Sequence, residues 1–335
     1  MKKVLITGAS GFVGSFLVED ALKKGYEVYA GIRGSSSRKY LPDERIKFLS
    51  LDFGNTNHLT KSLDDFAQEN NGGFDFIIHG AGITKANNIQ HYYDVNYLNT
   101  KHFVEALITT KTIPKKFIQV SSLAAFGPGN PKTLEPINHT HKPMPVSSYG
   151  KSKLVAEEYF ATLNDFPFII FRPTTVYGPR ERDLFTVFQM VNNGFEFYIG
   201  RKPQHLTFIY VKDLVTLMLD SLERDIINKS YFVSDGKSYE SSLLNTYIKQ
   251  GLNKKTIKLT MPVAVVKALA FTLEKSFGLF NQIPTLNSER VKEFESTNWK
   301  VFTDDLFLDF NFKPEYDLER GVMETIAWYK QEKWL

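Results

Sequence analysis

The chain has 335 residues, of which 42% are hydrophobic and 23% are charged, and this composition excludes both a disordered tail and a mini-protein. The net charge of +4, without a dense lysine or arginine block, predicts no nucleic-acid partner. Cysteine is absent, which excludes disulfides, thiolate catalysis and cysteine-ligated zinc or iron–sulfur centres, and we predict no metal site. A chain without cysteine suits a reducing compartment, so we expect a cytoplasmic location.

The amino terminus starts like a signal peptide, with two lysines before apolar residues, but the apolar run stops at Thr7, far short of a signal sequence. No stretch of about 18 uncharged apolar residues follows, so we predict no transmembrane segment. The most apolar stretch, 263–280, is interrupted by Lys267, Glu274 and Lys275. We interpret it as an amphipathic surface or lid helix.

In the first half of the chain, short apolar runs alternate with amphipathic stretches. Strands are predicted at 3–7, 27–32, 46–51, 74–79, 116–121 and 168–172. Helices are predicted at 11–24, 58–69, 94–110 and 149–163. Strict alternation of strand and helix is typical of a doubly wound α/β fold with a parallel sheet and helices on both faces.

The second half is less regular. Strands at 207–211 and 230–233, separated by a helix at 211–222, are predicted to return to the main sheet. The segments 178–204 and 239–314 are rich in helical patterns and scattered aromatic residues, which indicates a smaller domain. We therefore predict a dinucleotide-binding domain (1–177 plus about 205–235), a substrate-binding domain (about 178–204 plus 236–315) and a carboxyl-terminal helix (316–335).

Three glycines spaced three apart, Gly8, Gly11 and Gly14, lie between the first strand and the first helix. The first allows a tight turn, the second lets a pyrophosphate approach the backbone, and the third lets the helix pack on the sheet. The phosphates would bind the free N–H groups at the start of the helix. This context predicts a dinucleotide site rather than an ordinary turn.

The end of the second strand indicates which dinucleotide binds. A site for NAD usually has an acidic residue about 20 residues after the glycines, to bind the ribose hydroxyls. Here Arg33 stands in that place, followed by serines that include Ser36, and by Arg38. A guanidinium suits a 2′-phosphate, so the sequence favours NADP over NAD, unless Arg33 lies on a solvated loop.

Tyr149 and Lys153 are four residues apart on a predicted helix and therefore point the same way. An ammonium beside a phenol favours the phenolate, so we expect Lys153 to lower the pKa of Tyr149 and make it a proton donor and acceptor. Ser121 and Ser122 end the fifth strand, at the sheet edge where ligands bind in such folds. A serine hydroxyl there would hold the substrate oxygen, although loop capping is the alternative for both.

Together these motifs resemble the extended short-chain dehydrogenase/reductases, also called the NAD-dependent epimerase/dehydratase family. The resemblance rests on Thr7, Gly8, Gly11, Gly14, Asp52, 96–100, Ser121, Ser122, Phe126, Gly127, Tyr149, Lys153, Arg172, Pro173, Val176, Tyr177, Gly178, Pro179, Phe208, Val211, Asp213 and Leu214, in the family's order. It implies a Rossmann domain with a small substrate domain, and a catalytic triad of Ser122, Tyr149 and Lys153. It also makes a homodimer plausible.

The resemblance further implies that Lys153 holds the nicotinamide ribose, that Asn96 orders the backbone of the active site and that 173–176 runs past the nicotinamide. Asp52 is expected to accept a hydrogen bond from adenine, with a helix cap as the alternative. The expected cofactor contacts are Gly8, Ser10, Gly11, Phe12, Val13, Gly14, Arg33, Ser36, Asp52, Phe53, Gly80, Ala81, Gly82, Asn96, Val120, Tyr149, Lys153, Pro173, Thr175 and Val176.

The family contains reductases, sugar epimerases and sugar dehydratases. Dehydratases carry an Asp-Glu pair where this chain has Leu123 and Ala124, which argues against that activity. Many epimerases bind diphosphate with an arginine where this chain has Leu206, although Arg180, Arg182 or Arg201 could replace it. The apolar segment 261–284 resembles the 3β-hydroxysteroid-dehydrogenase-like and dihydroflavonol-reductase-like branches, and such a lid suits a lipophilic ketone.

Three hypotheses follow. The first is an NADP-dependent oxidoreductase that acts on a ketone or secondary alcohol as its small-molecule substrate. The second is a nucleotide-sugar epimerase that works through a transient keto intermediate and needs an anion site for the diphosphate. The third is a cofactor-binding protein without turnover, against which the intact Ser122, Tyr149 and Lys153 set argues.

Overall fold

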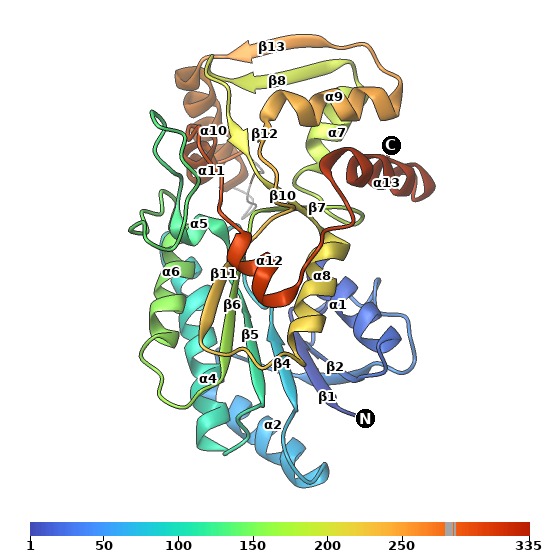
Figure 1. Cartoon of the computed structure of the whole chain (residues 1–335), viewed down its shortest axis with the longest axis vertical. Helices are drawn as coiled ribbons and strands as arrows, with labels where there is room; N and C mark the ends of the chain where they lie inside the picture. Colours follow the sequence, from blue (N-terminus) through green and yellow to red (C-terminus); the bar gives the residue numbers. More distant parts are fainter. Residues whose placement is uncertain (279–283, 285) are drawn as a thin grey trace.

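The computed structural model describes residues 1–278, 284 and 286–335, and its centre is a seven-stranded sheet (Figure 1). The strands are β1 (Lys3–Thr7), β2 (Glu27–Ile32), β3 (Lys47–Ser50), β4 (Phe76–His79), β5 (Lys116–Val120), β6 (Phe168–Pro173) and β11 (Lys229–Val233). All are parallel, in the order β11-β6-β5-β4-β1-β2-β3. The predicted doubly wound Rossmann sheet is confirmed.

Helices cover both faces of this sheet because alternate strand residues point to opposite sides. In β1, Val4 and Ile6 enter one hydrophobic core, whereas Leu5 enters the other. The first core is closed by α1 (Phe12–Lys23), α8 (Val211–Ser221) and α12 (Asp304–Phe310). The second is closed by α2 (Thr56–Glu69), α4 (Asn99–Thr109) and α6 (Ser148–Phe160).

The helix predicted at 94–110 is more complex than expected. It consists of a short α3 (Ile89–Tyr93), a π-helical turn η1 (Asp94–Leu98) and then α4. π-turns of this kind occur frequently at functional sites. The turn contains Asn96, whose side chain is completely buried.

The remaining elements lie mainly in the upper part of Figure 1. Three two-stranded sheets pair β7 (Thr175–Tyr177) with β10 (Phe208–Tyr210), β9 (His205–Leu206) with β12 (Tyr239–Glu240), and β8 (Phe195–Ile199) with β13 (Ile257–Met261). The helices are α5 (Leu123–Phe126), α7 (Phe185–Asn192), α9 (Ser241–Leu252), α10 (Val263–Gly278), α11 (Ser288–Phe294) and α13 (Leu318–Gln331).

Two expectations about this half need correction. The strand predicted at 230–233 joins the main sheet as β11, but the strand predicted at 207–211 does not, since β10 pairs with β7 in a separate two-stranded sheet. Aromatic residues explain the difference, because Phe208 and Tyr210 pack with Tyr177 in a separate core. The strands β8 and β13 lie in segments where we predicted mainly helix.

Among the described residues, no helix has the length and apolar character needed to cross a bilayer. The predicted lid is only partly described: α10 forms over 263–278, whereas residues 279–283 and 285 lie outside the described residues.

Candidate active site

The glycine-rich loop joins β1 to α1 in the geometry that the motif predicts. Gly8 has a φ of +68°, and a Cβ there would lie 2.6 Å from the carbonyl oxygen of Gly80. A Cβ on Gly14 would lie 2.1 Å from the carbonyl oxygen of Gly8, so the helix packs directly on the loop. Gly11 caps α1 without a side-chain acceptor, which leaves the first amides of the helix available to an anion. Ser10, Phe12 and Val13 lie on this loop and the first turn of α1.

Arg33 and Asp52 follow the adjacent strands β2 and β3. Arg33 is exposed, and its N–H donates to Oγ of Ser36 at 3.1 Å in a tight turn. Asp52 is also exposed and accepts the N–H of Gly54 at 3.1 Å, whereas Asn55 provides the N-cap of α2. Phe53 packs edge-on against rings of the core, those of His79 and Phe103.

His79, the last residue of β4, is buried and takes part in a row of hydrogen bonds between side chains. Its Nδ1 lies 2.8 Å from Oγ1 of Thr7, and its Nε2 lies 3.1 Å from Oγ1 of Thr100. Burial, together with the charge of Lys153, lowers the pKa of His79 to about 3, so the ring stays neutral. Thr7 also accepts the N–H of Ala81 at 3.2 Å, which fixes the start of the loop formed by Gly80, Ala81 and Gly82.

Asn96 connects this loop to the helix that carries Tyr149. Its amide oxygen accepts the N–H of Ile83 at 2.9 Å, and its Nδ2 donates to the carbonyl of Ile83 at 3.0 Å. Nδ2 also donates to Oγ of Ser152 at 3.0 Å, and this hydroxyl donates to the carbonyl of Tyr149 at 2.7 Å. A Cβ on Gly82 would lie 2.9 Å from Oδ1 of Asn96, so this site accepts only glycine without rearrangement.

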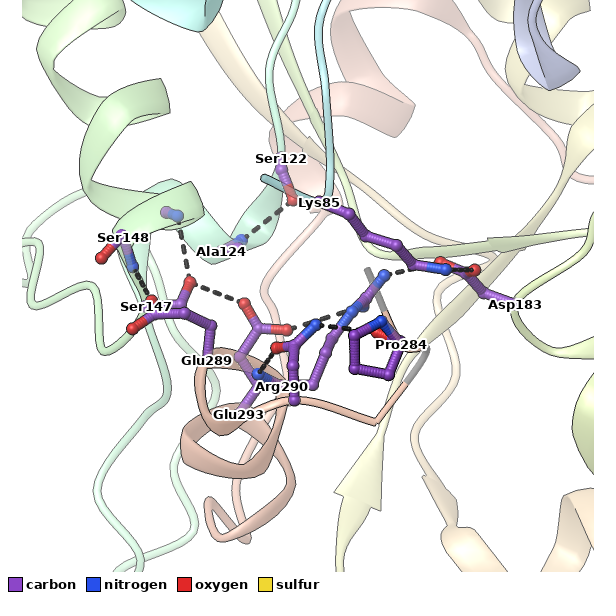
Figure 2. Close-up of polar contacts among 12 residues, drawn as sticks. Lys85, Ser122, Ala124, Ser147, Ser148, Asp183, Pro284, Glu289, Arg290 and Glu293 are labelled. Carbon is purple, nitrogen blue, oxygen red and sulfur yellow. Dashed lines mark hydrogen bonds and ion pairs between the residues drawn. The ribbon is translucent and has the colours of Figure 1, made fainter. Parts of the chain in front are cut away.

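Ser122, Tyr149 and Lys153 meet at the carboxyl end of β5. Ser122 caps α5, and its Oγ accepts the N–H of Ala124 at 3.1 Å (Figure 2). Tyr149 is the second residue of α6, and Ser122 lies close enough to its phenol to lower the pKa of that group. One turn later, Nζ of Lys153 donates to the carbonyl of Val120 at 2.9 Å. The residues Pro173, Thr175 and Val176 follow at the end of β6 and in β7.

The expected direction of the Tyr149 pKa is wrong for this structure. Burial raises the pKa of Tyr149 to about 12 and lowers that of Lys153 to about 8. Desolvation by burial has the largest effect on the Tyr149 pKa, and Ser122 lowers that pKa only in part. At neutral pH the phenol therefore carries its proton, which is the state needed to donate one.

A buried ion pair lies behind Lys153. Arg172 on β6 binds Oε2 of Glu157 through Nε at 2.9 Å and Nη2 at 2.7 Å. Oε1 of the same carboxylate accepts the hydroxyl of Ser121. Of the two candidate serines, Ser121 is thus committed to this pair and Ser122 faces Tyr149. Glu157 also raises the pKa of Lys153 and so opposes the effect of burial.

The arginines considered for diphosphate binding have other roles. Arg180 donates to Oγ of Ser15 at 2.9 Å and to Oε1 of Glu19 at 2.6 Å, which fastens it to α1. The guanidinium of Arg182 lies 5.8 Å from the ring centroid of Trp334. Within the described part of the chain, Arg201 forms no hydrogen bond or ion pair with the triad residues.

A charged network near the triad was missed at the sequence level. Lys85 and Arg290 each form an ion pair with Asp183, at 2.6 Å (Figure 2). The three residues come from segments that are distant in sequence. Arg290 also lies 3.8 Å from Glu293, whose Oε1 accepts the hydroxyl of Ser147, the N-cap of α6, at 2.7 Å. The charges of Glu293 and Arg290 act on the phenol of Tyr149, raising and lowering its pKa respectively.

The sequence model of the NAD dependent epimerase/dehydratase family matches residues 4–233. A sterol-4-alpha-carboxylate 3-dehydrogenase (decarboxylating) of Dictyostelium discoideum is 22% identical over 97% of this chain and 100% of its own. A ceramide reductase of Caulobacter vibrioides is 23% identical over 99% of this chain and 96% of its own. A UDP-glucose 4-epimerase of Vibrio cholerae is 26% identical over 98% of this chain and 96% of its own. These relatives are enzymes, and they include both oxidoreductases and an epimerase.

Because the glycine-rich loop is closely packed, a side chain at Gly14 should destabilise the protein. Gly14→Ala should lower the free energy of unfolding by about 1–3 kcal/mol, because the new methyl group overlaps the carbonyl of Gly8. Gly34→Ala is the matched control, since a Cβ there meets no atom within 4 Å. Guanidinium unfolding of the cofactor-free protein measures both, and equal stability of Gly14→Ala and wild type would contradict the expectation.

Proposed function

Because the chain belongs to the NAD-dependent epimerase/dehydratase family, we propose that it is an oxidoreductase that transfers hydride between NADP(H) and a ketone or secondary alcohol. The observation that supports this most strongly is the convergence of Ser122, Tyr149 and Lys153 beside the glycine-rich loop. When bound, the nicotinamide supplies or accepts the hydride. The residues of the chain supply the proton and hold the reacting oxygen.

The proton chemistry follows from the local environment. Tyr149 holds its proton at neutral pH and donates it to the carbonyl oxygen as that oxygen gains charge. The Ser122 hydroxyl holds the same oxygen, since Ser122 lies next to the phenol and lowers its pKa. Lys153, kept cationic by Glu157, stabilises the phenolate that remains. Asn96 holds the backbone of Tyr149 through Ser152.

We infer that the substrate is lipophilic. The position that carries an acid pair in dehydratases is occupied by Leu123 and Ala124, so no second acid lies there for elimination. The helix α10 exposes apolar side chains such as Leu269 and Phe271. Two of the relatives are named for a sterol carboxylate and a ceramide, which are lipids.

A nucleotide-sugar epimerase is the second candidate, and the charged network supports it. Lys85 and Arg290 bring two cations to one carboxylate, Asp183, and an epimerase needs an anion site for the sugar diphosphate. The UDP-glucose 4-epimerase relative also favours this reaction. The two candidates differ in one readout, because an epimerase leaves the total of reduced cofactor unchanged whereas a reductase consumes it.

The first prediction for the proposed activity concerns Tyr149. With NADPH and a panel of hydrophobic ketones, Tyr149→Phe should lower kcat by about 10²–10⁴-fold, because it removes the proton donor. Binding of NADPH, followed by its fluorescence, should remain. Tyr159→Phe on the same helix is the control and should keep full activity, as its ring packs against Tyr97 and Phe160. Wild-type protein that binds NADPH but reduces no ketone would favour the epimerase, to be assayed with UDP-sugars.

The second prediction concerns the choice of cofactor. Arg33→Asp should lower the ratio of kcat/KM for NADPH over NADH by about tenfold or more, because it replaces a charge-assisted contact with repulsion. Arg45→Ala is the control, since Arg45 is exposed and pairs with Asp43. An unchanged ratio in Arg33→Asp would mean that Arg33 lies on a solvated loop and does not select the cofactor.

The third prediction concerns pH. Reduction requires a cationic Lys153, whose pKa burial lowers to about 8, so activity should fall as the pH rises through that region. Glu157→Gln removes the charge that raises this pKa, and the alkaline limb of the pH profile should therefore move to lower pH. Glu158→Gln, an exposed neighbour, should leave the limb in place. Loss of stability in Glu157→Gln without movement of the limb would assign Glu157 a structural role alone.

A further inference from the structure

The pair of strands β8 and β13 presents an apolar face to solvent. Phe195 pairs with Ile257 and Phe197 pairs with Leu259, so the four side chains share one face of the ribbon. Each is between 37% and 63% exposed, which is high for side chains of this size. On the opposite face, Glu196 is buried and binds Lys249 of α9 at 2.8 Å.

The helix α10 continues this apolar face. Ile199 and Met261, at the end of the same face, pack against Val266 and Ala270 of α10. The helix α10 itself exposes four large apolar residues: Val265, Leu269, Phe271 and Phe277. The ribbon and the helix lie together at the top of Figure 1. We call these eight exposed residues of β8, β13 and α10 the apolar end face. Exposed apolar residues gathered at one end of a molecule in this way mark an interaction site.

The segments that form the apolar end face are rich in basic residues, of which Lys267 pairs with Glu295, at the end of α11, at 2.6 Å. The segments 193–202 and 254–278 contain seven basic residues, Arg201, Lys202, Lys254, Lys255, Lys258, Lys267 and Lys275, and only two acidic ones. Both carboxylates are engaged, since Glu196 is buried against Lys249 and Glu274 accepts the N–H and hydroxyl of Ser288 at 2.8 Å. This end of the molecule therefore attracts a negatively charged surface.

We propose that the apolar end face docks the protein on a bilayer that contains anionic lipids. The apolar side chains enter the boundary between headgroups and acyl chains, and the surrounding lysines bind the lipid phosphates. Such binding is peripheral and needs no membrane-spanning helix. Charge favours the bilayer over a second copy of this chain, because two such faces would bring their lysines together. The proposal concerns a surface outside the triad and stands whichever reaction the triad performs.

Co-sedimentation with lipid vesicles tests the proposal. Wild-type protein should bind vesicles of phosphatidylcholine mixed with phosphatidylglycerol, bind vesicles of phosphatidylcholine alone about tenfold more weakly, and dissociate as salt is raised. Two double variants should each weaken binding about tenfold or more: Phe195→Ser with Phe197→Ser, and Lys254→Glu with Lys255→Glu. Wild-type protein that stays in solution with both vesicle types would overturn the proposal.

Matched controls change the same kinds of residue elsewhere. Ile89→Ser with Leu308→Ser removes exposed apolar side chains, and Lys61→Glu with Lys111→Glu reverses exposed charges, away from the apolar end face. Both should bind like wild type, and equal loss in a control would overturn the assignment to this face.

Phe197→Trp tests the contact with lipid without removing an apolar side chain, because the fluorescence of the new tryptophan should be quenched by brominated lipid. A dimer in light scattering that Phe195→Ser with Phe197→Ser dissociates, without vesicle binding, would reassign the face to self-association.

Discussion

The site depends on one buried ion pair, that of Arg172 and Glu157. Two guanidinium nitrogens bind one carboxylate oxygen and the Ser121 hydroxyl satisfies the other, so β5, β6 and α6 are held in one arrangement. A buried pair of this kind adds little net stability compared with apolar residues, but loss of one partner is costly. Its value here is electrostatic and geometric, because Glu157 lies one helical turn beyond Lys153 and supports the charge of that buried ammonium.

Much of the framework was predictable because its causes are local. The strands β1 and β2 have the predicted bounds, since each is an apolar run that ends at a glycine or a charged residue. The glycine positions were equally readable, since Gly8 needs a positive φ and Gly14 needs contact with a backbone carbonyl. Glu157 was also within reach, because its spacing from Lys153 repeats that of Lys153 from Tyr149, yet the sequence analysis passed over it.

The rest depended on contacts between distant segments. No local pattern connects Lys85, Asp183 and Arg290, which meet only after the chain has folded around the sheet. The strands β8 and β13 were missed because parallel pairing of 195–199 with 257–261 depends on the intervening chain. The pKa of Tyr149 was misjudged for a related reason, since burial is a property of the folded neighbourhood and here outweighs the helical spacing to Lys153.

The helix α11 follows α10 of the apolar end face and contacts the start of α6, which carries Tyr149. From α10, the chain continues to α11, where Glu289 accepts the N–H of Ser148 and Glu293 accepts the hydroxyl of Ser147. These contacts are made at the first turn of α6, the turn that carries Tyr149. A displacement of α11 would therefore remove two acceptors from the start of α6.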